Sequence, residues 1–227
     1  MEENINRKIF FIVDFDGTIV KENSSIILAQ LIISSLTNSL ARVFYKVLLF
    51  LLPRLSPMLW FLSMLRNNDI DLVRYLIVFR LIHKNNIDFA KVSRISARLL
   101  TLKNNVLELL HDLVKKYDCK IIILSAGVRD IIDAFLHRTL ISKQLKIKTI
   151  VATTIIKKNP LTIREITKRS KVRVLSLIKR KYGNKVILIY ISDSINELKL
   201  IRNSSIARII LINVYNNGFN LYQEACH

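Results

Sequence analysis

The segment DFDGT at residues 14–18 directly follows an apolar run at residues 9–13, and no other feature of the chain constrains the fold as much. The run is rich in branched and aromatic residues and predicts one buried β-strand. Residues two apart in a strand point to the same side, so Asp14 and Asp16 are expected to converge if the chain stays extended, while Gly17 lets it turn away. Two carboxylates beside a buried strand end are costly unless a cation balances them. The segment therefore predicts a site of chemistry at the end of a strand.

Four further apolar runs of strand length follow along the chain, and helical patterns separate most of them. Strands that alternate with helices predict a parallel sheet covered on both faces, which is a Rossmann-like α/β core. In such sheets the ligand site lies beyond the carboxyl ends of the strands, where Asp14 and Asp16 are expected. The predicted strands are residues 120–124, 148–152, 185–191 and 207–212, and the predicted helices are residues 105–117, 128–136, 171–182 with Gly183 as a C-terminal stop, and 195–201.

Between residues 21 and 98 no strand alternation is visible, and three or four helical stretches take its place. This pattern predicts an all-helical insertion after the first strand, with the proportions of a cap domain. The predicted domains are therefore an α/β core formed by residues 1–20 and 99–227 and a helical cap formed by residues 21–98.

The apolar stretch at residues 47–65 approaches the length of a membrane span, but two prolines and Arg54 fall in its middle. A spanning helix needs about 20 predominantly apolar residues, and a central arginine is expensive in it. A buried helical hairpin is the expected structure, and an interfacial hairpin with Trp60 at a membrane surface is the alternative. The helix expected at residues 71–83 is apolar nearly all round, so we expect it to contact the core, another subunit or lipid.

The formal net charge is +19, which predicts attraction to anions such as nucleic acid, anionic lipid or small phosphorylated molecules. Residues 157–185 carry many cations and a single acid, Glu165, but neither a nucleic-acid motif nor interleaved aromatics accompany them. Cys119 and Cys226 form no CxxC pair, which suits a reducing compartment. The acidic N-terminus runs straight into the first strand and does not match a signal peptide. We therefore expect a cytoplasmic protein, with peripheral membrane association as the alternative.

Polar residues also follow the predicted strand at residues 120–124. Ser125, Ala126 and Gly127 come next in the sequence, and the following residues have a helical pattern. A hydroxyl followed by backbone amides at a helix N-terminus can bind an anion. The alternative is that Ser125 is a plain N-cap.

A second acidic pair, Asp193 and Glu197, follows the predicted strand at residues 185–191. Mg²⁺ is typically held by one or two protein carboxylates together with water and phosphate oxygens, so this pair is a candidate for a metal site. The alternative is that Asp193 or Ser194 only caps the following helix. Lys171 opens the preceding predicted helix, and by itself it indicates nothing in so basic a chain.

Taken in order, these elements resemble the haloacid dehalogenase (HAD) superfamily of phosphotransferases. The order is strand-DFDGT, strand-Ser, a lysine at a helix start, and strand-Asp with an acid four residues on. The resemblance covers residues 8–20 and about 100–212, and an insertion directly after the first motif is similar to the C1-capped members. The VATT segment at residues 151–154, with the later Leu161-Thr162 and Lys171-Val172 pairs, is similar to the phosphoserine-phosphatase-like branch.

The resemblance implies a chemical role for each acid. Asp14 would be the nucleophile that takes the phosphoryl group as an aspartyl-phosphate. Asp16 would protonate the leaving oxygen and then activate water for the second step. Mg²⁺ would be held by Asp14, Asp193 and the backbone carbonyl of Asp16.

The resemblance also implies a phosphate-binding set. Ser125 and the neighbouring amide of Ala126 would bind the phosphoryl oxygens. Lys171 would neutralise their charge, although Lys168 lies one helical turn away and is the alternative. The supporting positions implied by the family pattern are Gly17, Thr18, Gly127, Ser194 and Glu197.

The sequence departs from the family pattern in three places. Ser192 stands where glycine is usual, and Glu197 stands where aspartate is usual. The phosphoserine branch carries a substrate-contacting glutamate nine residues after the nucleophile, where this chain has Asn23, with Glu22 one place early. This last departure weakens phosphoserine as the expected substrate.

The expected function is a Mg²⁺-dependent phosphomonoester hydrolase that works through an aspartyl-phosphate. The alternatives are a phosphotransferase, in which an acceptor alcohol replaces water, and a non-enzymatic basic protein that binds nucleic acid or lipid on the same scaffold. The expected partner is a small phosphorylated substrate, and the apolar, basic cap suits one with an apolar group. Nucleic acid is not expected, whereas peripheral contact with an anionic membrane and a homodimer through the cap stay open.

Overall fold

The computed structural model describes residues 8–51, 70–156, 162–164, 166–204, 206, 209–215 and 218–225. The chain divides into two compact units. The first, which we call the core unit, comprises Met1–Asn23 and Leu100–His227, and the second, the helical unit, comprises Ser24–Leu99.

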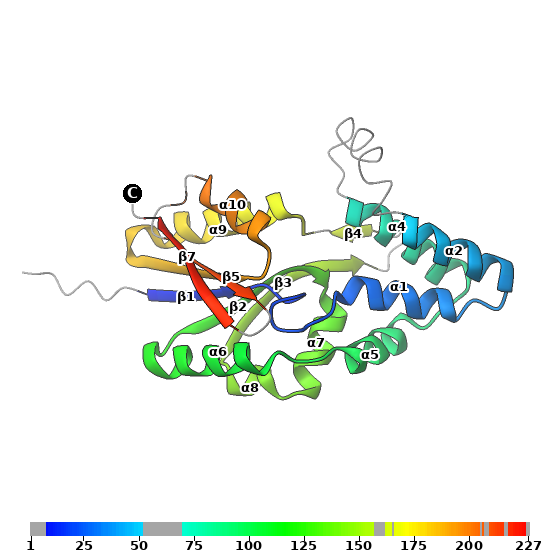
Figure 1. The fold of residues 1–227 in the computed structure, drawn as a ribbon, viewed down its shortest axis with the longest axis horizontal. Helices are drawn as coiled ribbons and strands as arrows, with labels where there is room; N and C mark the ends of the chain where they lie inside the picture. The colour runs from blue at the N-terminus through cyan, green and yellow to red at the C-terminus, as the bar shows by residue number, and fades with distance from the viewer. Residues whose placement is uncertain are drawn as a thin grey trace, which may run out of the picture. The chain divides into compact units, whose positions relative to one another are not determined.

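Within the described residues of the core unit, seven strands form one sheet in the order β4-β3-β2-β1-β5-β6-β7. Figure 1 shows the chain from β1 in blue to β7 in red. β1 pairs in parallel with β2 and β5, and the parallel pairing continues outward to β3 and β6. Antiparallel strands close both edges. The strands are β1 (Lys8–Val13), β2 (Lys120–Val128), β3 (Ile147–Ile156), β4 (Thr162–Arg164), β5 (Val186–Ser192), β6 (Ile209–Tyr215) and β7 (Gly218–Ala225).

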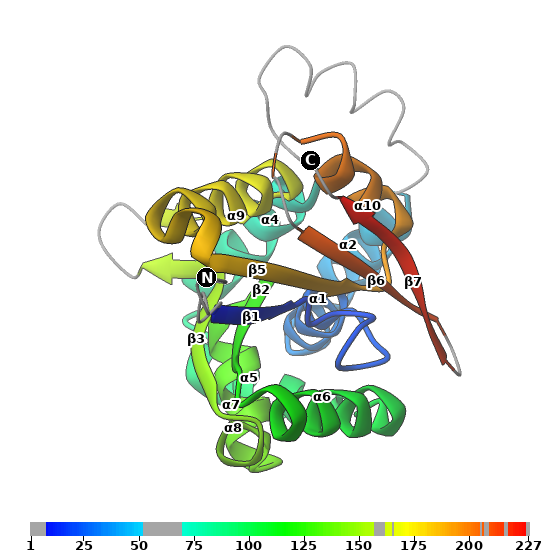
Figure 2. The ribbon, with the colours of Figure 1, turned by 90° about the vertical axis from the view of Figure 1, so that its left-hand side faces the viewer.

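Helices cover both faces of this sheet, and Figure 2 shows α9 and α10 on one side and α6 on the other. The central strands are therefore buried on both faces, so their apolar residues run continuously instead of alternating. Residues 10–13 of β1 and 188–192 of β5 are all buried. The predicted Rossmann-like α/β core is confirmed. Its helices are α6 (Asn104–Tyr117), α7 (Arg129–Arg138), α8 (Ile141–Gln144), α9 (Lys168–Tyr182) and α10 (Ile195–Arg202), with a 3₁₀ turn at Gly183–Lys185.

Three details of the sequence prediction are wrong. β2 does not end at Leu124 but runs on to Val128, so the predicted helix start at residue 128 shifts to Arg129. α9 begins at Lys168 and not at Lys171, because Thr167 caps it by accepting a hydrogen bond from the Ser170 amide. The antiparallel edge strands β4 and β7 were not predicted, since short or half-polar edge strands lack a continuous apolar run.

The helical unit contains α1 (Ser24–Ser34), α2 (Ser39–Leu51), α4 (Ile70–Lys84) and α5 (Phe89–Leu99), so the part of it that the structure describes is all helical, as predicted. Phe79 lies at its centre, with ring centroids 6.1 Å from Tyr75 and 5.8 Å from Phe89. The predicted hairpin at residues 47–65 lies outside the described residues beyond Leu51. Among the helices that the structure describes, none has both the length and the apolar character that a membrane crossing requires.

Candidate active site

The candidate site lies at the carboxyl ends of the two central strands, β1 and β5. Asp14 is the first residue after β1, and its amide donates to the carbonyl of Ile191 (2.9 Å), which extends the strand pairing by one residue. Asp193 is the first residue after β5. Asp14 is buried, whereas Asp193 is exposed, so one acid faces the interior and the other faces solvent. Neighbouring parallel strands thus bring together acids that are far apart in the sequence.

Hydrogen bonds connect the turn at residues 14–18 to Asp193. The hydroxyl of Thr18 donates to Asp193 Oδ1 (3.1 Å) and accepts from the Asp193 amide (3.0 Å). Gly17 has a positive φ of 72°, and a Cβ at this position would overlap the Asp193 carboxylate, with Cγ only 2.7 Å away. The ammonium group of Lys103, which precedes α6, donates a hydrogen bond to the carbonyl of Gly17. The site therefore requires glycine here both for the backbone conformation and for the close approach.

Lys171 forms ion pairs with two acids, Asp14 directly after β1 and Glu197 in α10. It is 1% exposed, and its Nζ lies 3.0 Å from Asp14 Oδ1 and 2.9 and 3.0 Å from the two oxygens of Glu197. Lys168, the alternative that the sequence leaves open, is exposed. The structure therefore brings Lys171, in the first turn of α9, to the carboxylates.

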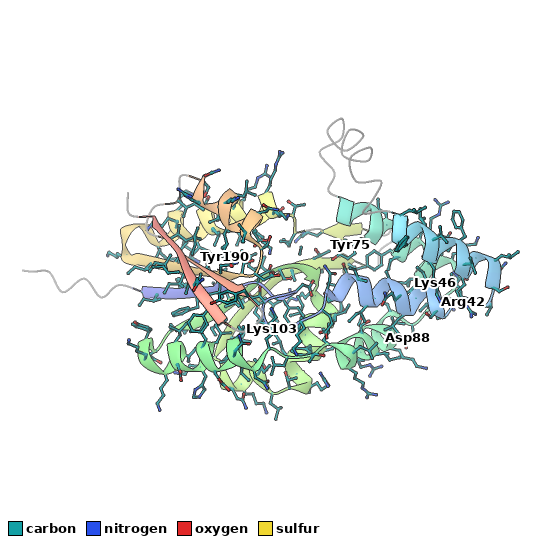
Figure 3. The ribbon with its side chains drawn as sticks, in the orientation of Figure 1. Arg42, Lys46, Tyr75, Asp88, Lys103 and Tyr190 are labelled. Carbon is teal, nitrogen blue, oxygen red and sulfur yellow. The ribbon has the colours of Figure 1, made fainter. Side chains whose placement is uncertain are left out.

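Glu197 has a second buried partner that the sequence analysis missed. The hydroxyl of Tyr190, a fully buried residue of β5, donates to Glu197 Oε1. The N-cap Ser194 accepts from the Glu197 amide (3.4 Å), which fixes the first turn of α10. Tyr190, Glu197, Lys171 and Asp14 form one hydrogen-bonded chain across four elements, and Tyr190 is labelled in Figure 3.

Burial and like charge determine the protonation of these groups. Although Asp193 as a whole is exposed, its carboxyl group is partly desolvated beside Thr18, which raises its pKa, and the negative charge of Asp14 raises it further. Burial also raises the pKa of Glu197, with Asp14 adding to the effect and Lys171 opposing it. Burial alone would lower the pKa of Lys171, but the Asp14 and Glu197 carboxylates more than compensate and raise it above its ordinary value. Lys171 therefore stays charged.

The Tyr190 hydroxyl is held in its neutral form by the same environment. Burial, followed by the charges of Glu197 and Asp14, raises the pKa of Tyr190 well above its ordinary value. A neutral phenol is a hydrogen-bond donor. The Tyr190 hydroxyl is therefore kept as the donor to Glu197.

Ser125 lies on β2, the strand next to Asp14, where Val13 is in register with Ile123. The predicted helix N-terminus at residues 125–127 is wrong, because these residues continue the strand across an irregularity in its pairing with β3. The Gly127 amide donates to the Ser125 hydroxyl (3.0 Å), and the Ala126 carbonyl accepts from the Thr153 hydroxyl (2.7 Å). The segment is thus held in place by local bonds and by β3.

Lys103, Tyr190 and Asn213 are further residues at the site that sequence reasoning missed. The Asn213 amide group donates to the carbonyls of Ser192 (3.2 Å) and Asp193 (3.1 Å), which steadies the end of β5 from β6. Tyr190 and Asn213 each interrupt an apolar strand with a polar group, and a buried polar group needs a partner. A polar group within an apolar strand is therefore the sequence signal from which Tyr190 and Asn213 could have been predicted. Lys103 gives no such signal in so basic a chain.

The acids fit a divalent cation, although the described residues contain no group of three or more His, Cys, Asp or Glu side chains placed to hold one. Asp14 and Asp193 are close enough for the charge of one to raise the pKa of the other, and Lys171 is already shared with Glu197. Two carboxylates with backbone and water oxygens are a typical donor set for Mg²⁺. The remaining negative charge at the strand ends therefore suits a bound cation.

The model of the haloacid dehalogenase-like hydrolase family matches residues 11–202. The chain therefore belongs to this family, which confirms the resemblance drawn from the motifs. No curated protein matches the sequence.

Solved structures share the fold at low sequence identity. A HAD family hydrolase from Salmonella enterica subsp. enterica serovar Typhi is 15% identical with a TM-score of 0.52, and the match covers 86% of this chain but only 60% of that one. A Bordetella pertussis Tohama I protein of unknown function is 12% identical with a TM-score of 0.61 and 86% coverage of both chains. A phosphoserine phosphatase, solved as an analogue of its phospho-aspartyl intermediate, is 14% identical with a TM-score of 0.53, covering 86% of this chain and 82% of that one.

Proposed function

We propose that this hydrolase is a Mg²⁺-dependent phosphomonoesterase that works through an aspartyl-phosphate on Asp14. The observation that carries the proposal is the buried ammonium of Lys171, 3.0 Å from Asp14 Oδ1, beside a second acid at the end of the neighbouring strand. A carboxylate attacks a phosphate dianion only when positive charge offsets their repulsion. The structural likeness to a phosphoserine phosphatase with a phospho-aspartyl intermediate analogue is consistent with this chemistry.

In the first step Asp14 attacks phosphorus, so that a new O–P bond forms as the ester P–O bond breaks. Asp14 Oδ1 accepts from the Phe15 amide (2.8 Å) and from Lys171, so we assign the attack to Oδ2. Asp16, which is half-buried two residues on, gives its proton to the leaving alcohol. In the second step Asp16 takes a proton from water, the water oxygen attacks phosphorus, and the acyl-phosphate bond breaks to return Asp14 and release phosphate.

The remaining groups hold the phosphoryl oxygens. We assign hydrogen bonding to these oxygens to the Ser125 hydroxyl, whose oxygen already accepts from Gly127 and can therefore donate its proton outward, and to the Ala126 amide. Asp14, Asp193 and the Asp16 carbonyl would hold Mg²⁺, whose positive charge would offset the repulsion between the phosphate and the carboxylate nucleophile. Asn213 and Thr18 position Asp193 for this task.

We also propose that the helical unit is a cap that selects the substrate. Residues 23–68 of the sequence contain no Asp or Glu and are rich in apolar residues. This composition suits a phosphomonoester that carries an apolar group, because cations attract the phosphate and hydrocarbon accommodates the remainder.

The test is hydrolysis of an aryl phosphate and of a panel of metabolite phosphomonoesters by the full chain. We expect phosphate release that requires Mg²⁺, is lost with EDTA, and returns when excess Mg²⁺ is added. Asp14→Asn should lower kcat on the order of 10⁴-fold while its circular dichroism stays that of the wild type. An Asp14→Asn enzyme that is as active as the wild type, or activity that survives complete chelation, would refute the mechanism.

A further inference from the structure

One face of α2 in the helical unit exposes an unusual amount of hydrocarbon. Six of its apolar side chains are between 37% and 80% exposed. They recur at intervals of three and four residues, so they lie along one side of the helix. We call this face the α2 stripe, and it consists of Leu40, Val43, Phe44, Val47, Phe50 and Leu51.

α2 exposes apolar side chains on the side away from its packing contacts, whereas a surface helix of a soluble domain exposes polar ones there. The half-buried residues are Ala41, Arg42, Tyr45 and Leu48. Arg42 is turned back onto the unit, where its guanidinium donates to the Leu36 carbonyl at 3.2 and 2.6 Å. Packing within the described part of the helical unit therefore covers the side with the arginine and leaves the α2 stripe exposed.

The surroundings of the stripe carry positive charge. Lys46, which Figure 3 labels on α2, is exposed at the edge of the stripe. No Asp or Glu occurs between Glu22 and Asp69 in the sequence, and the whole chain carries a formal charge of +19. A second copy of this helix would bring like charge against like charge. An anionic partner is favoured instead.

We propose that α2 is an interfacial helix that docks the helical unit onto a bilayer containing anionic lipid. A helix with an apolar face bordered by lysine and arginine lies in the plane of a membrane surface, with the apolar side chains at the boundary between headgroups and acyl chains. The stripe enters that boundary, and Lys46 contacts the anionic headgroups. This docking is independent of the catalytic groups, and it goes beyond the proposed phosphatase activity.

The test is co-sedimentation of the full chain with phosphatidylcholine vesicles and with mixed phosphatidylcholine–phosphatidylglycerol vesicles. So basic a protein will adhere to anionic lipid by charge alone, so the decisive measurement is made at about 0.5 M salt, where the Debye length is only about 4 Å. We expect binding to the mixed vesicles that persists at this salt concentration and is weaker on the neutral ones.

The variant is Leu40→Ser with Phe44→Ser, and the matched control is Leu177→Ser with Phe219→Ser, the same exposed residue types in the core unit. Truncating the stripe should lower the partition coefficient at high salt about tenfold or more, because two large side chains no longer leave water, and the control should bind like the wild type. Equal binding by the stripe variant, or a wild type that stays in the supernatant, overturns the proposal. So does a wild-type dimer that the stripe variant dissociates, because the stripe would then be the interface with a second copy.

Discussion

In the core unit, Asp14, Lys171 and Glu197 carry charge yet are buried, whereas in the helical unit the more apolar face of α2 is exposed to solvent. Charged side chains are almost never fully buried unless they are paired, and large exposed apolar patches on soluble domains are uncommon. The two units thus depart from the ordinary burial pattern in opposite directions. Each departure marks a surface or a site where folding stability alone does not explain the residues present.

The buried charges of the core unit cannot be explained as a source of stability. The desolvation of a buried ion pair roughly offsets its Coulomb attraction, and well-packed apolar residues often serve stability equally well. Here one ammonium is shared by two carboxylates, and Asp193 adds a further negative charge nearby. Such an arrangement is understandable if it is preorganised for a phosphoryl group and a metal ion. Removing the buried charges and the exposed hydrocarbon in turn shows what each contributes to stability and turnover.

Lys171→Met should reduce both stability and activity more than any other variant considered. Removing the shared ammonium leaves Asp14 and Glu197 buried without a counter-charge, so the free energy of unfolding should fall by about 3–5 kcal/mol and turnover should be lost. The deficit should shrink as the pH falls from neutral toward the already raised pKa of Glu197, because a protonated carboxyl is less costly to bury. Urea denaturation across a pH series measures both effects.

Lys168→Met is the matched control for this variant, since Lys168 lies in the same turn of α9 but is exposed. It should change the free energy of unfolding by no more than about 0.5 kcal/mol. The double variant Lys171→Met with Glu197→Gln should be less destabilised than Lys171→Met alone. Equal losses at Lys168 and Lys171 would mean that the buried charge cluster is not organised around Lys171.

The next effect in size is that of Gly17→Ala. The new methyl group would overlap the Asp193 carboxylate and force it away from Asp14, so kcat should fall about a hundredfold or more. Gly183→Ala is a close control, because Gly183 also has a positive φ (59°) but, among the described residues other than its chain neighbours, no atom lies within 4 Å of its Cβ position. Both variants should lose about 1 kcal/mol of stability from backbone strain. Steady-state kinetics should distinguish them, because only Gly17→Ala should lower kcat. Comparable activity in the two would show that the close approach to Asp193 is unimportant.

Much of the core unit could be predicted because its signals are local in sequence. The apolar runs predict the central strands, and Asp14 and Asp193 are found because they come directly after such runs. The extension of β2 through Ser125 could not be predicted, because the irregular pairing with β3 is a tertiary property. The choice of Lys171 over Lys168 could not be predicted, because both lie in the first turn of α9 and the packing of that helix decides which one is buried.

The helical unit shows a different limit of sequence analysis. The sequence predicts helical stretches in this region, and α2 carries Leu40, Val43, Phe44 and Val47 on one side, but helical periodicity does not say whether that side faces the interior. Ordinary packing would turn it inward. In the structure the side that carries Ala41, Arg42, Tyr45 and Leu48 is the half-buried one instead. Orientation of this kind is decided by tertiary contacts and not by the pattern itself.

A smaller effect is expected for Tyr190→Phe. This change removes the hydroxyl that donates to Glu197, and hydrogen bonds to charged groups contribute about 1.5–3 kcal/mol to stability. Glu197 would then hold Lys171 less firmly, so kcat should fall about tenfold with little change in KM. Tyr182→Phe is the control, since Tyr182 precedes the amino-terminal end of β5 and lies away from these acids. If both variants match the wild type in kcat, Tyr190 does not position the site.

The smallest effect is expected for Leu40→Ser with Phe44→Ser, measured without lipid. Exposed side chains contribute little to folding, so the free energy of unfolding should change by no more than about 0.5 kcal/mol, and turnover of a soluble aryl phosphate should equal that of the wild type. Phe79→Ser in the same unit, where Phe79 is buried against Tyr75 and Phe89, should instead cost about 3–5 kcal/mol. A stripe variant as unstable as Phe79→Ser would mean that the α2 stripe is internal packing, and the contrast between the two units would disappear. If the variant is as stable and as active as the wild type, the α2 stripe contributes to neither folding nor catalysis. Its exposed apolar side chains are then explained by a binding partner outside the chain.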